Sequence, residues 1–266
     1  MKDKIICITG ASSGIGWATA KAFANHGARL ILCGRRKEKL DELEAQLKVE
    51  TVQLIFDVRE RKAVFKAFES LASPWKKIDV LVNNAGNAHG LDPVQTANID
   101  DWDAMIDGNV KGLMYVTKAV LPHMVESKKG QIINLGSIAG KEVYPNGSVY
   151  CSSKFAVDAF TSGLRIDLNP FGIRVGAIHP GLVETEFSEV RFKGDEQRAA
   201  KVYHGIDALT AEDVADAILY MANVPEKVNI ADVVILPTRQ ANAYINNRES
   251  KVGLEFSPPL LSSFKN

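Results

Sequence analysis

The chain has 266 residues, a length within reach of a single α/β domain. Hydrophobic residues make up 46% and charged residues 24%, the ordinary mixture of a globular protein with enough apolar material for a large core. The 32 basic and 32 acidic side chains give a formal net charge of +0, and without a basic field we expect no binding to nucleic acid or to an anionic membrane.

The cysteines and the N-terminus bear on where the protein works. Cys7, Cys33 and Cys151 are isolated and no pair has metal-ligand spacing, so we expect unbridged thiols and no metal site. The N-terminus runs directly into a predicted strand without the apolar core of a signal peptide, and no apolar run is long enough to cross a bilayer. These features predict a soluble, cytoplasmic protein.

A glycine-rich turn follows the first predicted strand, residues 5–8, and precedes an alanine-rich helix. Its glycines let the backbone turn tightly and approach a pyrophosphate, while the helix N-terminus offers free N–H groups. The residues expected to bind a dinucleotide here are Gly10, Ser12, Ser13, Gly14, Ile15 and Gly16. A purely structural glycine turn is the alternative, because the Gly-x3-Gly-x-Gly spacing differs from the commoner fingerprint.

Two arginines, Arg35 and Arg36, follow the second predicted strand, residues 29–33. An NAD-binding chain carries an acidic residue about 20 positions past the glycine turn, where it binds the ribose 2′-hydroxyl. A guanidinium instead pairs with a 2′-phosphate, which a carboxylate would repel. We therefore predict NADP as the cofactor, with Ser12 adding a hydrogen bond. The alternative is that both arginines are solvated charges at a helix entry.

Alternation of strands and helices continues through the next third of the chain. A third strand, 52–56, is closed by Asp57 and Val58, and Asp57 is well placed to meet the adenine amino group. A fourth strand, 78–82, ends in a small-residue turn whose backbone can pass close to a nucleotide, at Asn84, Ala85 and Gly86. This order predicts an α/β fold: a single Rossmann-like, doubly wound parallel sheet of about seven strands with helices on both faces.

Residues 99–123 are predicted to form one long helix, or a helix with a local irregularity. Asn109 lies within it, flanked by Gly108 and Gly112, which are poor helix formers. Such local inconsistency often marks a functional site. After a fifth strand, 131–135, Ser137 lies at the carboxyl end, where doubly wound sheets bind ligands.

Tyr150 and Lys154 lie one helical turn apart, on one face of the next predicted helix. A phenol ordinarily keeps its proton to about pH 10. A neighbouring ammonium favours the phenolate, so we expect Lys154 to lower the pKa of Tyr150 toward the working range. Alone, this spacing arises by chance on many solvated helices.

The whole set of motifs resembles the short-chain dehydrogenase/reductase family, over residues 1 to about 245. The motifs are the glycine turn from Thr9 to Gly16, Asp57-Val58, Asn83-Asn84-Ala85-Gly86, Asn109, Ser137, Tyr150-x3-Lys154 and Pro180-Gly181. The resemblance implies that Tyr150 is the general acid in reduction and the base in oxidation. It implies that Lys154 also binds the nicotinamide ribose, that Ser137 binds the substrate oxygen, and that Asn109 holds a water linking Lys154 to solvent.

The resemblance extends to the last third of the chain. It implies that Pro180, Gly181, Val183 and Thr185, after a sixth strand at 173–178, hold the carboxamide of nicotinamide. It also implies pairing of long helices across a dimer axis, hence a homotetramer, with a dimer as the smaller alternative. His179 is a further acid–base candidate, but the four residues above already fill that role.

Residues 186–204 are polar without a strong period and are predicted to form a mobile lid over the substrate. Residues 186–195 resemble one branch of the family, the NADP-dependent 3-hydroxy acid dehydrogenases, which oxidise serine and allo-threonine. Arg191 or Lys193 would then pair with a substrate carboxylate; a solvated charged loop is the alternative. Ile138, Val143 and Tyr144 are candidate pocket walls, with ordinary core contacts as the alternative.

A last helix is predicted from Thr210, its N-cap, to about residue 222, followed by a seventh strand at 233–236. We expect one domain over residues 1–245 and a C-terminal tail at 246–266. The resulting hypothesis is an NADP-dependent dehydrogenase acting on the 3-hydroxyl of a small hydroxy acid. A broad carbonyl or diketone reductase and a non-catalytic NADPH-binding sensor remain alternatives.

Overall fold

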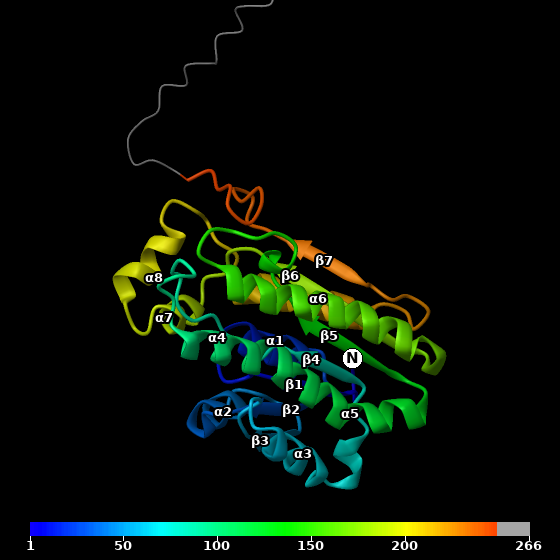
Figure 1. Ribbon diagram of the computed structural model, residues 1–266. Helices are drawn as coiled ribbons and strands as arrows, with labels where there is room; N and C mark the ends of the chain where they lie inside the picture. Colours follow the sequence, from blue (N-terminus) through cyan, green and yellow to red (C-terminus); the bar gives the residue numbers. More distant parts are fainter. Residues whose placement is uncertain (249–266) are drawn as a thin grey trace, which may run out of the picture.

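The computed structural model describes residues 1–248, which contain a seven-stranded sheet of order β3-β2-β1-β4-β5-β6-β7 (Figure 1). Every neighbouring pair of strands is parallel. The strands are β1 Ile5–Thr9, β2 Arg29–Gly34, β3 Thr51–Ile55, β4 Val80–Asn83, β5 Gly130–Leu135, β6 Ile173–Pro180 and β7 Asp232–Ile235. The predicted doubly wound parallel sheet is confirmed.

The order of the strands fixes where a ligand can bind. The chain builds outward from β1 through β2 to β3, then returns to place β4 on the other side of β1. In open α/β sheets, ligands bind at the carboxyl ends of the strands where the direction of winding reverses. The loops that follow β1 and β4 therefore meet at this point.

Helices cover both faces of the sheet (Figure 1). One face carries α3 Arg61–Glu69, α5 Leu113–Ser127 and α6 Ser148–Leu168, and the other α1 Gly14–Asn25, α2 Lys37–Glu44 and α9 Ala211–Asn223. Alternate residues of β1 enter different cores: Ile5 and Cys7 pack under α3 and α5, while Ile6 and Ile8 pack under α1. Two buried faces explain why the strand is apolar without interruption.

The irregularity predicted around Asn109 is a π-helical turn, Asp107–Gly112, between α4 Ile99–Ile106 and α5. Asn109 itself is buried, with 2% of its surface exposed. At Gly112 a β-carbon would lie 2.8 Å from the Val58 side chain, so the turn packs closely against the loop after β3. Such π-helical turns occur frequently at functional sites.

The segment 186–204 differs from its prediction, because it contains two short helices, α7 Phe187–Arg191 and α8 Glu196–Tyr203. The sequence pattern is weak because α7 buries only Ser188 and α8 buries only Ala199. The side chain of Asp195 caps α8 by accepting a hydrogen bond from the Arg198 N–H.

The last part of the described chain largely agrees with the prediction. Thr210 caps α9 in a reciprocal capping box with Asp213, as expected from its position. β6 extends two residues further than predicted, to Pro180, because it pairs with β7 as far as Ile235. Residues 249–266 of the predicted tail lie outside the described residues. Within residues 1–248 we find no helix with the length and apolar character needed to cross a membrane.

Candidate active site

A cavity of about 470 Å³ lies at the carboxyl ends of the strands. It is lined by residues of the glycine turn, the ends of β2 to β6 and the start of the 186–204 segment. All of the predicted cofactor residues line it except Gly16. A β-carbon at Gly16 would lie 2.3 Å from the Gly10 carbonyl oxygen, so this glycine allows α1 to pack against the turn.

The glycine turn is tied to the loop after β4. The hydroxyl of Thr9 accepts hydrogen bonds from the N–H groups of Asn84 and Ala85, both at 3.0 Å. The Asn84 amide donates back to the carbonyls of Thr9 and Gly10. Gly10 has a φ of +67°, a conformation that favours glycine. The two loops therefore form one rigid floor for the cavity.

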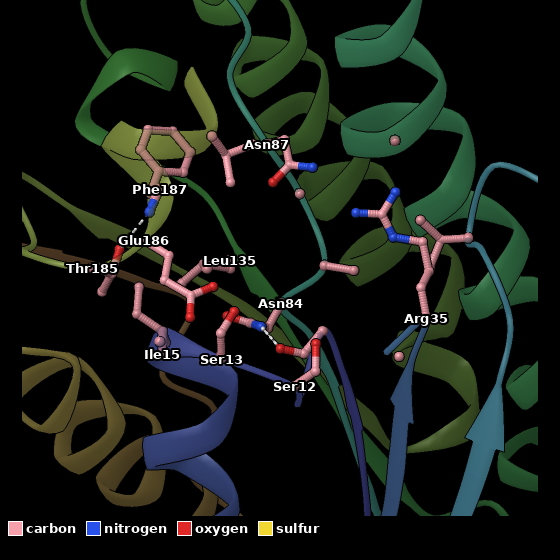
Figure 2. A pocket seen from close by; sticks show the side chains of 18 of the residues that line it. Ser12, Ser13, Ile15, Arg35, Asn84, Asn87, Leu135, Thr185, Glu186 and Phe187 are labelled. Atoms are coloured by element: carbon pink, nitrogen blue, oxygen red, sulfur yellow. Dashed lines mark hydrogen bonds between the residues drawn. The ribbon is translucent and has the colours of Figure 1, made fainter. Parts of the chain in front are cut away.

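Figure 2 shows this floor, with Ser12, Ser13, Ile15 and Asn84 gathered at the N-terminus of α1. Ser13 is the N-cap residue of α1 and makes no side-chain capping bond. The first N–H groups of the helix are thus left to face the cavity, the arrangement that binds phosphate.

The predicted arginines lie at the end of β2, on the same cavity. Arg36 donates from Nη2 to the Ser12 carbonyl oxygen at 3.3 Å and pairs through Nη1 with Glu186 at 3.0 Å. Arg35 Nη1 lies 3.6 Å from an oxygen of Asp57. Ser12 therefore supports the guanidinium of Arg36, while Glu186, from the far side of the cavity, partly neutralises it.

A third guanidinium, that of Arg59, also lines the cavity and was not predicted. It holds Asp57 with contacts as short as 2.7 Å. Burial raises the pKa of Asp57, but hydrogen bonds from Arg59 outweigh this effect and hold the pKa below its ordinary value. The carboxylate is therefore ionised near neutral pH and available as an acceptor. Only its place two residues after Asp57 could have suggested Arg59.

Three of the four predicted catalytic residues, Ser137, Tyr150 and Lys154, line the cavity together. Ser137 follows β5, and its hydroxyl accepts a hydrogen bond from the Ala139 N–H at 3.1 Å. Lys154 donates to the Leu135 carbonyl oxygen at 2.9 Å, and its Nζ lies 5.9 Å from the centre of the Tyr150 ring. A proton donor, an oxygen anchor and a cation thus converge on one wall.

Asn109 lies behind this wall and does not line the cavity. Its amide nitrogen donates to the Asn87 carbonyl at 2.8 Å and to the Ser153 hydroxyl at 3.0 Å, while its oxygen accepts from the Asn87 N–H. The side chain therefore fastens the loop after β4 to α6. A β-carbon at Gly86 would lie 2.9 Å from the Asn109 side-chain oxygen and 3.7 Å from Lys154 Nζ. The absence of a side chain at Gly86 therefore lets both groups approach the loop after β4.

The electrostatics of Tyr150 differ from the prediction. Burial raises the pKa of Tyr150 above its ordinary value, and only the hydrogen bond from Ser137 and the charge of Arg191 act to lower it. Burial also lowers the pKa of Lys154 to about 8, which weakens the positive charge expected to act on the phenol. In this structure the desolvation of both groups outweighs their proximity.

The predicted substrate residues Ile138, Tyr144 and Arg191 do not line the main cavity. Arg191, on α7, lies beside Tyr150 in an adjoining recess. It donates from Nε to the Gly90 carbonyl at 3.0 Å and from Nη2 to the Tyr144 hydroxyl at 3.1 Å. Its guanidinium carbon is 5.6 Å from the centre of the Tyr150 ring.

The other predicted substrate contacts are weaker. Lys193 pairs with Asp101 at 3.0 Å, so its charge is already partnered, and Val143 is 59% exposed. Phe187 packs edge-on against Tyr150, with ring centres 5.8 Å apart. Prediction missed Phe187 and Glu186 as cavity residues because the 186–204 segment carries no local motif that orients them. Figure 2 shows both residues on the side of the cavity opposite Arg35.

The chain is similar to several known proteins. The family described as short chain dehydrogenase matches residues 4–196. The NADP-dependent 3-hydroxy acid dehydrogenase YdfG of Salmonella typhi is 45% identical, covering 92% of this chain and 100% of the relative. Sulfoacetaldehyde reductase 2 of Chromohalobacter salexigens is 45% identical, covering 89% of this chain and 95% of the relative.

A solved structure is similar at the level of the backbone. It is titled the closed form of serine dehydrogenase complexed with NADP+, and it superimposes with a TM-score of 0.87 at 44% identity. The match covers 92% of this chain and 100% of the other.

Proposed function

The chain belongs to the short-chain dehydrogenase family, and on this basis we propose that it is an NADP-dependent oxidoreductase acting on a small 3-hydroxy acid such as serine or allo-threonine. The observation that carries the proposal is the joint placement of Ser137, Tyr150 and Lys154 in the cavity that also holds the glycine turn and Arg35. Relatives that match nearly the whole chain are named for NADP and for hydroxy acids.

The residues present fit NADP. The open N-terminus of α1 suits a pyrophosphate, and Arg35 and Arg36 suit a 2′-phosphate. At Gly14 a β-carbon would come within 3.3 Å of Thr185, which shows how closely the glycine turn faces the residues proposed to hold the carboxamide. When bound, the cofactor supplies the hydride chemistry, and the protein supplies position and proton transfer.

Proton transfer falls to Tyr150. In oxidation its oxygen takes the proton of the substrate hydroxyl, and in reduction it returns that proton. Ser137 holds the substrate oxygen beside it. Because the pKa of Lys154 is about 8, this side chain can pass a proton onward near neutral pH. We assign Asn109 to holding the relay in place, since its amide fixes Asn87 and Ser153.

The substrate's anionic group is assigned to Arg191. Its guanidinium lies beside the Tyr150 ring, 5.6 Å from the ring centre, in the recess that both residues line. Both a 3-hydroxy acid and sulfoacetaldehyde carry an anion close to the reacting carbon, and relatives at 45% identity are named for each. A shared anion site explains how such similar chains are named for different substrates.

The function is tested by supplying the purified protein with NADP+ and serine, allo-threonine or 3-hydroxybutyrate, and in reverse with NADPH and diacetyl or sulfoacetaldehyde. Turnover of the hydroxy acids supports the proposal. Turnover of uncharged carbonyls alone would favour the broad reductase instead. Tight NADPH binding without turnover across the whole panel would favour the sensor.

We expect Arg191→Gln to raise the KM for hydroxy acids by roughly 10- to 100-fold, the loss typical of one hydrogen bond to a charged group. The KM for diacetyl, which has no anion, should change little. The matched control is Lys193→Gln. It removes a positive charge from the same segment, but that charge is already paired with Asp101. Equal losses for charged and uncharged substrates would mean that Arg191 serves only to hold Gly90 and Tyr144.

We propose that the 186–204 segment is the substrate lid. The N–H of Gly90 donates to the Arg191 carbonyl, and Arg198 donates to the Leu91 carbonyl. These contacts close the segment onto the loop after β4, which bounds the cavity. A hydride transfer site needs such exclusion of water.

Glu186, at the start of this lid, is expected to weaken NADPH binding because its carboxylate occupies Arg36 at 3.0 Å. Both side chains are about half exposed, so the pair is worth roughly 0.2–1 kcal/mol. Glu186→Gln should therefore lower the Kd for NADPH by about 1.5- to 5-fold and leave that for NADH unchanged. Isothermal titration would measure both constants. The control, Glu184→Gln, removes a negative charge two positions away. If it lowered the Kd for NADPH equally, the effect would come from net charge and not from the contact with Arg36.

We further propose that the enzyme is a cytoplasmic homotetramer. All three cysteines are unbridged, which suits a reducing compartment. Large apolar side chains are exposed on α6 and α9, among them Ile166 at 75% and Tyr220 at 66%. Burial of these exposed apolar side chains between subunits would favour association.

A further inference from the structure

A cluster of charged side chains around one buried histidine lies behind Ser137. At its centre is His179 of β6, whose side chain is fully buried. Nδ1 of His179 is 3.3 Å from the Ser137 carbonyl oxygen, and Nε2 is 2.7 Å from Asp232 and 3.6 Å from Asp158. Lys141 completes the cluster, with Nζ at 2.9 Å from Asp158 and 2.8 Å from Asp232.

The cluster is not a metal site. Asp158, His179 and Asp232 offer ligand atoms within 4.8 Å of one another. The ammonium of Lys141, however, already lies against both carboxylates and supplies the positive charge that they require. The role of the cluster must therefore be sought in what it touches.

The imidazole of His179 supports the backbone that carries Ser137. A β-carbon at Gly136 would lie 2.4 Å from Nδ1 of His179, so the chain rests directly on the ring. The N–H of Gly136 donates to the Ile178 carbonyl at 2.8 Å, which joins the ends of β5 and β6 at the same place. A side chain at position 179 without a polar atom at the place of Nδ1 would lose the contact with the Ser137 carbonyl oxygen.

Both ring nitrogens of His179 face acceptors, the carbonyl of Ser137 and the carboxylate of Asp232. A neutral imidazole has a single N–H and can donate to one of them only. Burial and the charge of Lys141 lower the pKa of His179, whereas Asp232 and Asp158 act to raise it. Nε2 lies 2.7 Å from a carboxylate oxygen of Asp232, but this contact does not have the geometry of a hydrogen bond. The ring therefore lies between the Ser137 carbonyl on one side and the Asp232 carboxylate on the other.

We propose that His179 is a positioning residue, which through the Ser137 carbonyl sets where the Ser137 hydroxyl lies relative to Tyr150. This inference rests on the proposed function, because it concerns the residue that holds the substrate oxygen. Asp232 and the Lys141–Asp158 pair fix the ring, and the ring fixes the turn after β5. Through this chain of contacts, β7 at the sheet edge acts on the residue that holds the reacting oxygen.

A change in Ser137 has a distinct signature in the pH profile. The Ser137 hydrogen bond lowers the pKa of Tyr150, as does Arg191, while burial, Tyr144 and Cys151 raise it. Displacing Ser137 therefore raises the pKa of Tyr150 further. Oxidation needs the phenolate, so the rise of its rate with pH should move to higher pH. A role in folding alone would leave this profile unchanged.

The test compares His179→Leu with His179→Asn, using the best hydroxy acid of the panel. Leucine fills similar volume without a polar atom, whereas the asparagine amide nitrogen can reach the place of Nδ1. We expect the leucine variant to lose at least about tenfold in kcat, the scale of a small misplacement of a reacting group, with an unchanged Kd for NADPH. Its oxidation profile should shift to higher pH, and the asparagine variant should recover most of the rate.

Several results would overturn the proposal. One is a folded leucine variant with unchanged kcat and pH profile; another is equal loss in the leucine and asparagine variants. If the leucine variant fails to fold, Asp232→Asn replaces it, because Asp232 is half exposed; the same shift is then expected, and its absence refutes the role. Val234→Thr, exposed on β7, is the control and should change nothing. A parent protein without any turnover would remove the proposed function and this inference together.

Discussion

Tyr150→Phe is expected to lower kcat by roughly 10²- to 10⁴-fold, the contribution typical of a positioned general acid or base. The change removes one oxygen atom from a ring that is 8% exposed and packed against Phe187, so the fold should be preserved. The Kd for NADPH should stay within a few-fold of the parent, because the glycine turn and the arginines are untouched. Steady-state rates in both directions, with isothermal titration of NADPH, would measure the two effects separately.

The pH dependence of the same variant sharpens this result. Burial holds the pKa of Tyr150 above its ordinary value, so the phenol keeps its proton through neutral pH. Reduction needs that proton and should be supported there, whereas oxidation needs the phenolate and should speed up as pH rises. Tyr150→Phe should lose this rise. Tyr115→Phe, the same change on α5, is the control and should behave as the parent. A Tyr150 variant that keeps most of its rate would contradict the proton-transfer role.

The sheet could be predicted because each strand and helix has a hydrophobic pattern that can be recognised within a short stretch of sequence. Inner strands such as β1 are buried on both faces, so the run from Ile5 to Ile8 is apolar without alternation, and a helical pattern follows it. The glycine turn could also be predicted from local sequence, because Gly10 adopts a positive φ that glycine accommodates more readily than other residues. Gly16 is the exception, because a packing glycine and a ligand-facing glycine look alike in the sequence.

The remainder of the site depends on contacts between residues far apart in the chain. Glu186 meets Arg36 across the cavity, although 150 positions separate them in the chain. His179 was noticed as a titratable residue, but its contact with the Ser137 carbonyl comes from the pairing of β5 and β6. No spacing rule within one segment predicts such meetings.

For Tyr150 and Lys154, the spacing predicted that the two side chains lie close together, but the predicted direction of the pKa shift of Tyr150 was wrong. Helical spacing does bring the ammonium to 5.9 Å from the tyrosine ring. Spacing contains no information about burial, however, and here only 8% of Tyr150 and 6% of Lys154 are exposed. Desolvation then acts on both groups, raising one pKa and lowering the other.

Arg35→Ala is expected to raise the Kd for NADPH by roughly 10- to 100-fold and to leave the Kd for NADH nearly unchanged. The two cofactors differ only in the 2′-phosphate, so a guanidinium that pairs with this group acts on one of them alone. Arg36→Ala should have a similar or larger effect, because Ser12 already supports its side chain and less order is lost on binding. Fluorescence titration of NADPH and NADH would give all four constants.

Substituting the neighbouring arginines, Arg59 and Arg61, would show which side chains contact the adenosine part of the cofactor. Arg59→Ala should weaken both cofactors alike, because Arg59 acts through Asp57 on the adenine that they share. Arg61→Ala, which removes the same charge from the start of α3, should affect neither. If Arg35→Ala weakened NADH as much as NADPH, the 2′-phosphate would have to lie elsewhere. An effect of Arg36→Ala alone would place the 2′-phosphate between the glycine turn and Glu186, where cofactor binding must then break the Arg36–Glu186 pair.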